Sequence, residues 1–423
     1  MPYWKSFHYG WIVVGAAFLT LLTSAGVRST PSILIVPLEN EFHWSRATIS
    51  LAISINLILY GVMGPFAAAM MERFGIRRTI PFALALIGTG VALTAMMSEP
   101  WQMILLWGVM VGTGAGATAS VLAAMVASHW FTERRGLAVG ILSASTATGQ
   151  LLFLPALASI TASYGWRATV LTVAAVVFMV LPIVTFFMRD RPADVGLAPY
   201  GESGGPKITP PVTGNPIGVA FKALGEAIHV RDFWLLAGTF FICGASTNGL
   251  IGTHLIPACV DNGISEITGA GLLAAMGLFN LVGTTGSGWL SDRVDNRILL
   301  AIYYGLRGLS LIYLPFSFVS LYGLSLFTVF YGLDWFATVS PTVRLIGNAF
   351  GKEKTGIVYG WIFVAHQLGG ASAAFFGGVL RENFGTYLES FMLSGLLCLG
   401  AAVLVMFIGR ERKEEAPVTS PAE

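Results

Sequence analysis

Long stretches without Asp, Glu, Lys or Arg dominate this sequence of 423 residues. The hydrocarbon core of a bilayer is about 30 Å thick, so a helix needs roughly 20 apolar residues to cross it. Only 11% of the residues are charged, against about 25% in an ordinary soluble domain. A water-soluble fold is therefore excluded, and the sequence predicts an all-α integral membrane protein.

Twelve segments are long and apolar enough to span a bilayer, once the uncharged stretch 308–333 is divided at the turn 321–323. The predicted spans are 10–38, 47–71, 79–97, 101–127, 136–161, 168–188, 232–260, 268–290, 298–319, 322–345, 355–380 and 388–409. The long proline-rich segment after the sixth span divides the chain. We expect a six-helix half at 1–190, a cytoplasmic linker at 191–231, a second six-helix half at 232–410 and a cytoplasmic tail at 411–423.

Lysines and arginines are unevenly distributed between alternate loops. With both termini in the cytoplasm, eighteen of these residues fall in inner loops or tails, and only Arg46, Arg167 and Arg381 fall in outer loops. Cytoplasmic loops of membrane proteins carry such an excess. We therefore expect a multi-pass protein of a bacterial cytoplasmic (inner) membrane with both termini inside. The net charge of +2 gives no reason to expect a nucleic-acid partner.

The two halves repeat one pattern at an offset of 220 residues. The pairs that coincide at this offset are Glu72 and Asp292, Arg73 and Arg293, Arg77 and Arg297, Gly112 and Gly332, and Gly165 and Gly385. A constant offset over the whole chain indicates two parallel six-helix repeats, which place a binding site at their interface near the bilayer midplane.

The loop 72–78, of sequence ERFGIRR, and its second copy at 289–293, WLSDR, resemble the loops after helices two and eight in the major facilitator superfamily. Within that superfamily, the segment 41–50 resembles the start of helix two in the monocarboxylate and oxalate/formate carriers. Arg28 stands near a lysine of helix one in monocarboxylate carriers, and His366 stands where oxalate/formate exchangers have a lysine in helix eleven. The resemblance implies a secondary active transporter that moves a small organic anion, a monocarboxylate, together with protons.

Charged residues within spans are costly, so each is a candidate for function. Arg28 is the expected carboxylate-binding residue, because a guanidinium offers a two-pronged charged donor; snorkelling to the outer interface is the alternative. Asp334 either pairs with Arg307 as a structural or coupling charge, or faces the cavity as a proton carrier. His366 is either a proton relay beside Asp334 or a packing residue.

Neutral hydrogen-bonding residues on helices that line the cavity in this superfamily complete the expected substrate site. They are Asn56, Tyr60, Gln150, Asn248, Asn280, Tyr331 and Gln367. Charged residues in the two repeated loops are expected to hold the halves together in one state and release them in the other. These gating residues are Glu72, Arg73, Arg77, Asp292, Arg293 and Arg297.

An enzyme is not expected, because no nucleophile–base arrangement stands out and none of the lysines completes a phosphate-binding loop. We expect no cofactor and no metal, and a monomer that takes a small organic anion and protons as its partners within the lipid bilayer. Two alternatives stay open: proton-coupled efflux of a hydrophobic compound, and a membrane sensor that does not transport.

Overall fold

The computed structural model describes residues 8–118, 120–202, 216–351 and 354–409, so the predicted tail 411–423 lies outside the described residues. The described chain is helical, and its one β contact is an isolated bridge between Phe131 and Tyr200. The first half contains α1 (Gly10–Phe42), α2 (Arg46–Phe74), α3 (Ile76–Thr94), α4 (Pro100–Met103), η2 (Ile104–Val111), α5 (Gly112–Ala117), α6 (Ser120–Trp130) and α7 (Arg135–Phe187).

The second half contains α9 (Arg231–Gly244), η4 (Ala245–Ile251), α10 (Gly252–Asp261), α11 (Glu266–Ser291), α12 (Asn296–Ser317), α13 (Leu321–Asp334), α14 (Val339–Phe350), α15 (Thr355–Phe384), α16 (Leu388–Leu404) and η5 (Val405–Phe407). Between the halves lie η3 (Pro192–Val195) and α8 (Pro216–Ala227).

Ten helical stretches of the described chain are each long and apolar enough to span a bilayer, and two further features bring the number of membrane crossings to twelve. The α7 segment holds two crossings, because Gly165 interrupts its helical geometry with a φ of 79°. The crossing predicted at 322–345 is divided into α13 and α14 by a turn at residues 335–338. The predicted all-α fold with twelve transmembrane helices is confirmed.

The offset of 220 residues reappears in the backbone geometry of the turns that follow α1 and α10. His43 and Gly263, which are equivalent at this offset, both have positive φ, at 55° and 77°. The next helices then begin in the same way: the Ser45 and Ser265 side chains each accept a 3.2 Å hydrogen bond from the backbone N–H three residues later. Such side-chain caps satisfy amide groups that a helix start leaves free.

The offset also reappears in close contacts between helix backbones. A Cβ added at Gly112 would lie 2.9 Å from the Cα of Asn56, and one added at Gly332 would lie 2.9 Å from the Cα of Met276. The pairs 112/332 and 56/276 both differ by 220, so the two halves pack these helices in the same way. Glycine is needed at both positions because any side chain would separate the helices.

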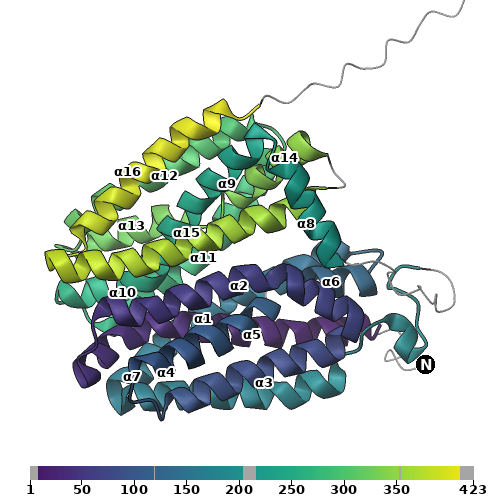
Figure 1. The fold of residues 1–423 in the computed structure, drawn as a ribbon, viewed down its shortest axis with the longest axis horizontal. Coiled ribbons are helices and arrows are strands. Elements are labelled where there is room, and N and C mark those ends of the chain that lie inside the picture. The colour runs from purple at the N-terminus through teal and green to yellow at the C-terminus, as the bar shows by residue number, and fades with distance from the viewer. Residues whose placement is uncertain (1–7, 119, 203–215, 352–353, 410–423) are drawn as a thin grey trace, which may run out of the picture.

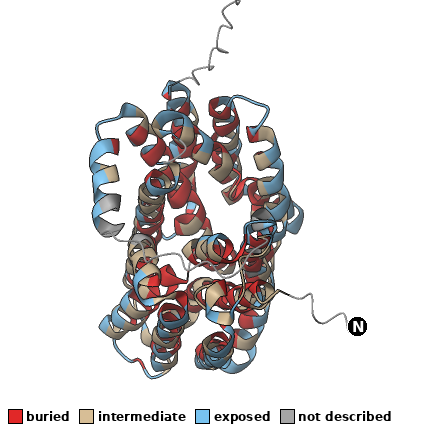
Figure 2. Ribbon diagram, turned by 90° about the vertical axis from the view of Figure 1, so that its right-hand side faces the viewer, coloured by how far each residue is buried: buried red, intermediate tan, exposed pale blue. Residues whose placement is uncertain are grey.

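The helices run side by side between two ends of the bundle (Figure 1). We call the end at which α1 begins and α8 lies the linker end, and the opposite end, which carries the turns at 43–45, 262–265 and 385–387, the far end. The halves meet where α2 packs on α15, α7 on α11, and α1 on α10. Buried residues gather where helices face one another, and exposed residues lie around the outside (Figure 2). That outer surface carries exposed large apolar side chains such as Phe82, Phe186 and Phe316, as a lipid-facing surface requires.

Candidate functional site

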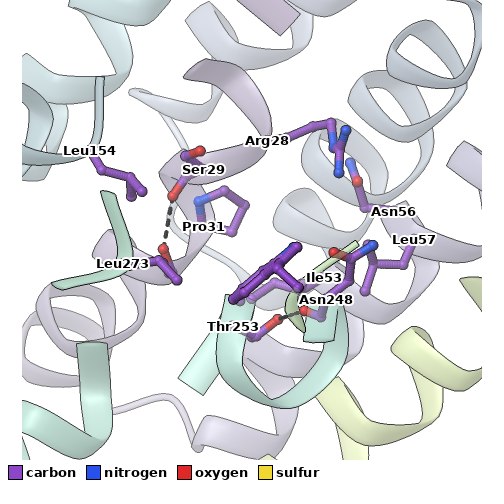
Figure 3. A pocket seen from close by; sticks show the side chains of 13 residues that line it. Arg28, Ser29, Pro31, Ile53, Asn56, Leu57, Leu154, Asn248, Thr253 and Leu273 are labelled. Atoms are coloured by element: carbon purple, nitrogen blue, oxygen red, sulfur yellow. Dashed lines mark hydrogen bonds between the residues drawn. The ribbon is translucent and has the colours of Figure 1, made fainter. Parts of the chain in front are cut away.

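A cavity of about 60 Å³ lies between the two halves (Figure 3). A single water needs about 10–15 Å³, so this space suits a ligand of a few non-hydrogen atoms. Its lining residues are Arg28, Ser29, Pro31, Ser32, Ile53, Asn56, Leu57, Leu154, Asn248, Gly252, Thr253, Leu273 and Trp335. In Figure 3, Arg28, Asn56 and Asn248 lie on one side of the cavity, and Leu154 and Leu273 on the opposite side.

Arg28 on α1 supplies the cavity with a positive charge. Its guanidinium donates a 3.0 Å hydrogen bond to the Tyr60 hydroxyl and lies 4.4 Å from the centre of the Tyr60 ring. Tyr60 and Asn56 are four residues apart on α2 and therefore share one helix face. Arg28 forms no ion pair with another described residue, so its charge is available to a bound anion.

Two amide side chains face the same space from different halves. The Asn56 amide nitrogen donates to the backbone oxygen of Trp107 at 2.8 Å, which leaves its oxygen and its second N–H as the groups it can offer to the cavity. Asn248 on η4 is equivalent to Arg28 at the 220-residue offset and also lines the cavity. The site therefore combines one cation with neutral groups, an arrangement that suits a small, singly charged ligand.

Asp334 and Arg307 form a buried ion pair beside the cavity and not in its lining. The Arg307 side chain is fully buried and its Nε donates to the Asp334 carboxylate at 2.5 Å. Its Nη2 also donates to the backbone oxygens of Asp334 and Trp335, at 2.6 and 3.2 Å. One carboxylate oxygen of Asp334, Oδ1, has no hydrogen-bond partner among the described residues.

His366 lies within the second half, among aromatic rings. It is buried, its ring centre lies 4.7 Å from that of Phe240, and it stacks on Phe363 at 5.6 Å. No hydrogen bond or ion pair joins His366 to Asp334 in the described structure. This environment is that of a packing histidine whose Nδ1 has no partner among the described groups.

Three of the other expected substrate residues, Asn280, Tyr331 and Gln367, lie outside the lining of the cavity. Asn280 accepts hydrogen bonds from the Thr284 hydroxyl and from the Phe336 backbone N–H. Tyr331 donates to the backbone oxygen of Ser246 at 2.8 Å. Gln367 packs against Gly61 on α2, and neither atom of its amide has a partner among the described residues. Gln150 lies on α7, but its side chain is outside the described part of the structure.

The gating residues of the first loop lie at the linker end and contact their own half or the segment that follows it. Glu72 lies 3.4 Å from the His129 ring nitrogen. The Arg73 guanidinium lies over the Phe74 ring, and the Arg77 backbone N–H donates to Asp190.

The gating residues of the second loop contact their own half. Asp292 pairs with Arg344, and Arg293 lies over the Trp289 ring. Arg297 pairs with Asp295 at 2.7 Å. Nearby, the Lys354 ammonium lowers the pKa of Glu226 on α8 through a 2.6 Å ion pair.

At the far end, a network of four charged side chains joins the halves, and we call it the far-end latch: Glu39, Arg46, Asp261 and Arg381. Arg46 donates two parallel 2.8 Å hydrogen bonds to Asp261 and a third to Glu39. Arg381 holds the same Asp261 from its other side at 2.6 Å. Arg46 is only 6% exposed, so the structure is closed at this end.

The sequence does not reveal the latch or the cavity role of Trp335. Arg46 and Asp261 are 215 residues apart, and the one available signal is that the latch residues all lie at the ends of predicted spans on the same side of the membrane. Trp335 begins the uncharged segment 335–343, and its one signal is its position directly after Asp334.

Replacing Asp261 by Asn is expected to open the far end more often, because the bidentate ion pair with Arg46 stabilises only the closed arrangement. Breaking a buried hydrogen-bonded charge pair costs about 2–5 kcal/mol, so the equilibrium shifts by at least about tenfold. Labelling of a Ser50→Cys variant by a membrane-impermeant maleimide measures the change, since Ser50 is fully buried beside Gly378. Glu226→Gln, which breaks an exposed pair at the linker end, should leave this labelling unchanged; equal labelling in both variants would contradict the prediction.

Comparison with known proteins places these features in a family. Residues 16–374 match the Major Facilitator Superfamily. The chain is 26% identical to the uncharacterized MFS-type transporter YcxA of Bacillus subtilis (strain 168), with 94% of this chain and 92% of that protein covered. It is 25% identical to monocarboxylate transporter 13 of Bos taurus, with 98% and 93% covered, and 23% identical to the oxalate:formate antiporter of Oxalobacter formigenes, with 94% and 91% covered.

The fold is also that of solved transporters. A D-xylose-proton symporter superimposes with a TM-score of 0.73 at 15% identity, over 96% of this chain and 99% of that structure. The predicted resemblance to the superfamily, and within it to the monocarboxylate and oxalate/formate carriers, is confirmed by the sequence matches over most of the chain. The chain belongs to the major facilitator superfamily, a family of membrane transporters and not of enzymes.

Proposed function

We propose that this transporter is a proton-coupled symporter of a small organic anion, specifically a monocarboxylate. The observation that carries the proposal is Arg28, a cation in the lining of the cavity that has no ion-pair partner among the described residues. A guanidinium matches a carboxylate geometrically and electrostatically. The printed names of the relatives, monocarboxylate transporter 13 and an oxalate:formate antiporter, support an anionic substrate.

Asp334 is the proposed proton acceptor. A carboxylate buried beside the cavity is costly, and its Oδ1 offers an unused lone pair for a proton. Protonation weakens its pairing with Arg307, which also holds the α13–α14 turn. In this cycle Arg28 takes the anion, Asp334 takes the proton, and the loaded carrier moves no net charge. We favour Asp334 over His366 as the group that carries the proton, because His366 lies among aromatic rings.

The proposed neutral partners of the substrate are Tyr60, Asn56 and Asn248. Further candidates, in other states of the transport cycle, are Gln150, Asn280, Tyr331 and Gln367. We further propose that the linker end faces the cytoplasm of a bacterial inner membrane, that the halves are 1–190 and 232–410, and that the monomer transports. The far-end latch then closes the outer side in this structure.

Uptake into proteoliposomes tests the proposal. With an inward proton gradient, the protein should accumulate labelled acetate, pyruvate or L-lactate, and a protonophore should abolish the accumulation. Because anion and proton move together, a valinomycin-clamped membrane potential should not change the initial rate. Absence of gradient-dependent uptake of any acid by folded protein contradicts the proposal, and competition by lipophilic compounds alone points to efflux of a hydrophobic compound instead.

A further inference from the structure

Trp335 combines three features that no other described residue shares. Its indole lines the cavity between the halves. The side chain is only 5% exposed, and its Nε1–H has no hydrogen-bond partner among the described residues. An unsatisfied donor in a buried position costs free energy. The nitrogen has almost no accessible surface in this closed arrangement, so an acid in the cavity supplies the missing acceptor, and recovers that free energy, when the cavity wall moves during the transport cycle.

The backbone of Trp335 belongs to the turn between α13 and α14 and is held on both sides. Arg307, which pairs with the Asp334 carboxylate, also donates to the Trp335 backbone oxygen at 3.2 Å. On the other side, the Phe336 N–H donates to the Asn280 side-chain oxygen at 3.1 Å. The position of the indole therefore depends directly on the Asp334–Arg307 pair.

The indole is also linked, through Tyr331, to η4, the segment that carries Asn248. It meets the Tyr331 ring edge-on, with ring centres 5.7 Å apart. The Tyr331 hydroxyl in turn donates to the backbone oxygen of Ser246 on η4 at 2.8 Å. A ring contact and a hydrogen bond, both made by Tyr331, thus link Trp335 to η4, the segment that carries the other lining residue Asn248. Arg28 lines the same cavity from the first half.

We propose that the indole N–H of Trp335 binds an oxygen of the transported acid while Arg28 binds its charge. This inference rests on the proposed function and assigns the residue through which the second half recognises the substrate. The acid then bridges Arg28 in the first half and Trp335 in the second. Since Arg307 holds both Trp335 and Asp334, occupation of the cavity is linked to the proton site through one guanidinium.

The test compares binding of acetate, pyruvate and L-lactate to the purified full-length protein by isothermal titration calorimetry. Trp335→Phe keeps an aromatic ring and removes the donor, so the Kd of the bound acid should rise at least about tenfold, as the loss of a hydrogen bond to a charged group implies. Trp335→His keeps a ring N–H and should recover most of the affinity. Trp101→Phe, at an exposed position on α4, should bind as the wild type does.

The outcomes separate this inference from the proposed function. Wild-type binding together with a Trp335→Phe affinity within twofold of it overturns the role of the indole N–H alone. Equal losses in the Phe and His variants, with both shown to be folded by thermal unfolding, also overturn it, because packing and not the donor would then matter. Failure of the folded wild type to bind any acid overturns both proposals.

Discussion

Replacing Arg28 by Ala is expected to lower kcat/KM for proton-driven acid uptake by at least about 30-fold. Arg28 is the cation in the cavity lining, and it forms no ion pair with any other residue that the structure describes. Loss of one partner of a desolvated charge pair costs about 2–5 kcal/mol, and each 1.4 kcal/mol is a factor of ten. Initial rates in proteoliposomes over a range of acid concentrations measure the effect.

Two further variants serve as controls for the Arg28→Ala measurement. Arg28→Lys keeps the charge but loses the two-pronged geometry, so its activity should lie between those of Arg28→Ala and the wild type. Arg231→Ala removes an exposed arginine at the start of α9 and should transport normally. An Arg28→Ala protein with wild-type KM and more than half of the wild-type rate would remove Arg28 from the substrate site.

The fold could be predicted from the sequence because two strong signals agree. Apolar stretches long enough to cross a bilayer fix the helices, and the 220-residue offset fixes how they are arranged. The equivalent turns at His43 and Gly263 show how far this symmetry extends into the backbone. The break between α13 and α14 could not be predicted, because residues 335–338 are as apolar as the helices on either side.

The site could be predicted only in part, because a sequence indicates which polar groups lie in a span but not which way each helix faces. Arg28, Asn56, Tyr60 and Asn248 do come together around the cavity. Asn280 lies on an expected helix too, but its oxygen is used to hold the α13–α14 turn.

The far-end latch shows that the sequence also does not indicate which charged residues pair with one another. Arg46 belongs to an outer loop by the distribution of charges, yet it is buried against Asp261 from the other half. This pairing depends on the tertiary structure, which brings together residues that are distant in the sequence.

Replacing Arg307 by Ala is expected to destabilise the protein by about 3–5 kcal/mol, because it leaves the Asp334 carboxylate buried without its charge partner. The same change frees the backbone oxygens of Asp334 and Trp335, which Arg307 binds at 2.6 and 3.2 Å. Unfolding in detergent by heat or denaturant measures the loss. The double variant Arg307→Ala/Asp334→Asn should recover part of it, since no unpaired charge remains, and additive losses in this double-mutant cycle would contradict a direct pair.

The single variant Asp334→Asn tests whether Asp334 is only the structural partner of Arg307 or also carries the proton. An amide has nearly the shape of the carboxylate and can still accept a hydrogen bond from Arg307, so the variant should fold. A proton carrier cannot be an amide, however, so proton-driven accumulation of acid should fall to background while exchange of labelled for unlabelled acid at equal pH continues. If Asp334→Asn still accumulates acid fully in response to a proton gradient, the Asp334–Arg307 pair is only structural and another residue couples transport to protons. If the folded variant loses both accumulation and exchange, the pair is needed for the movement of the halves.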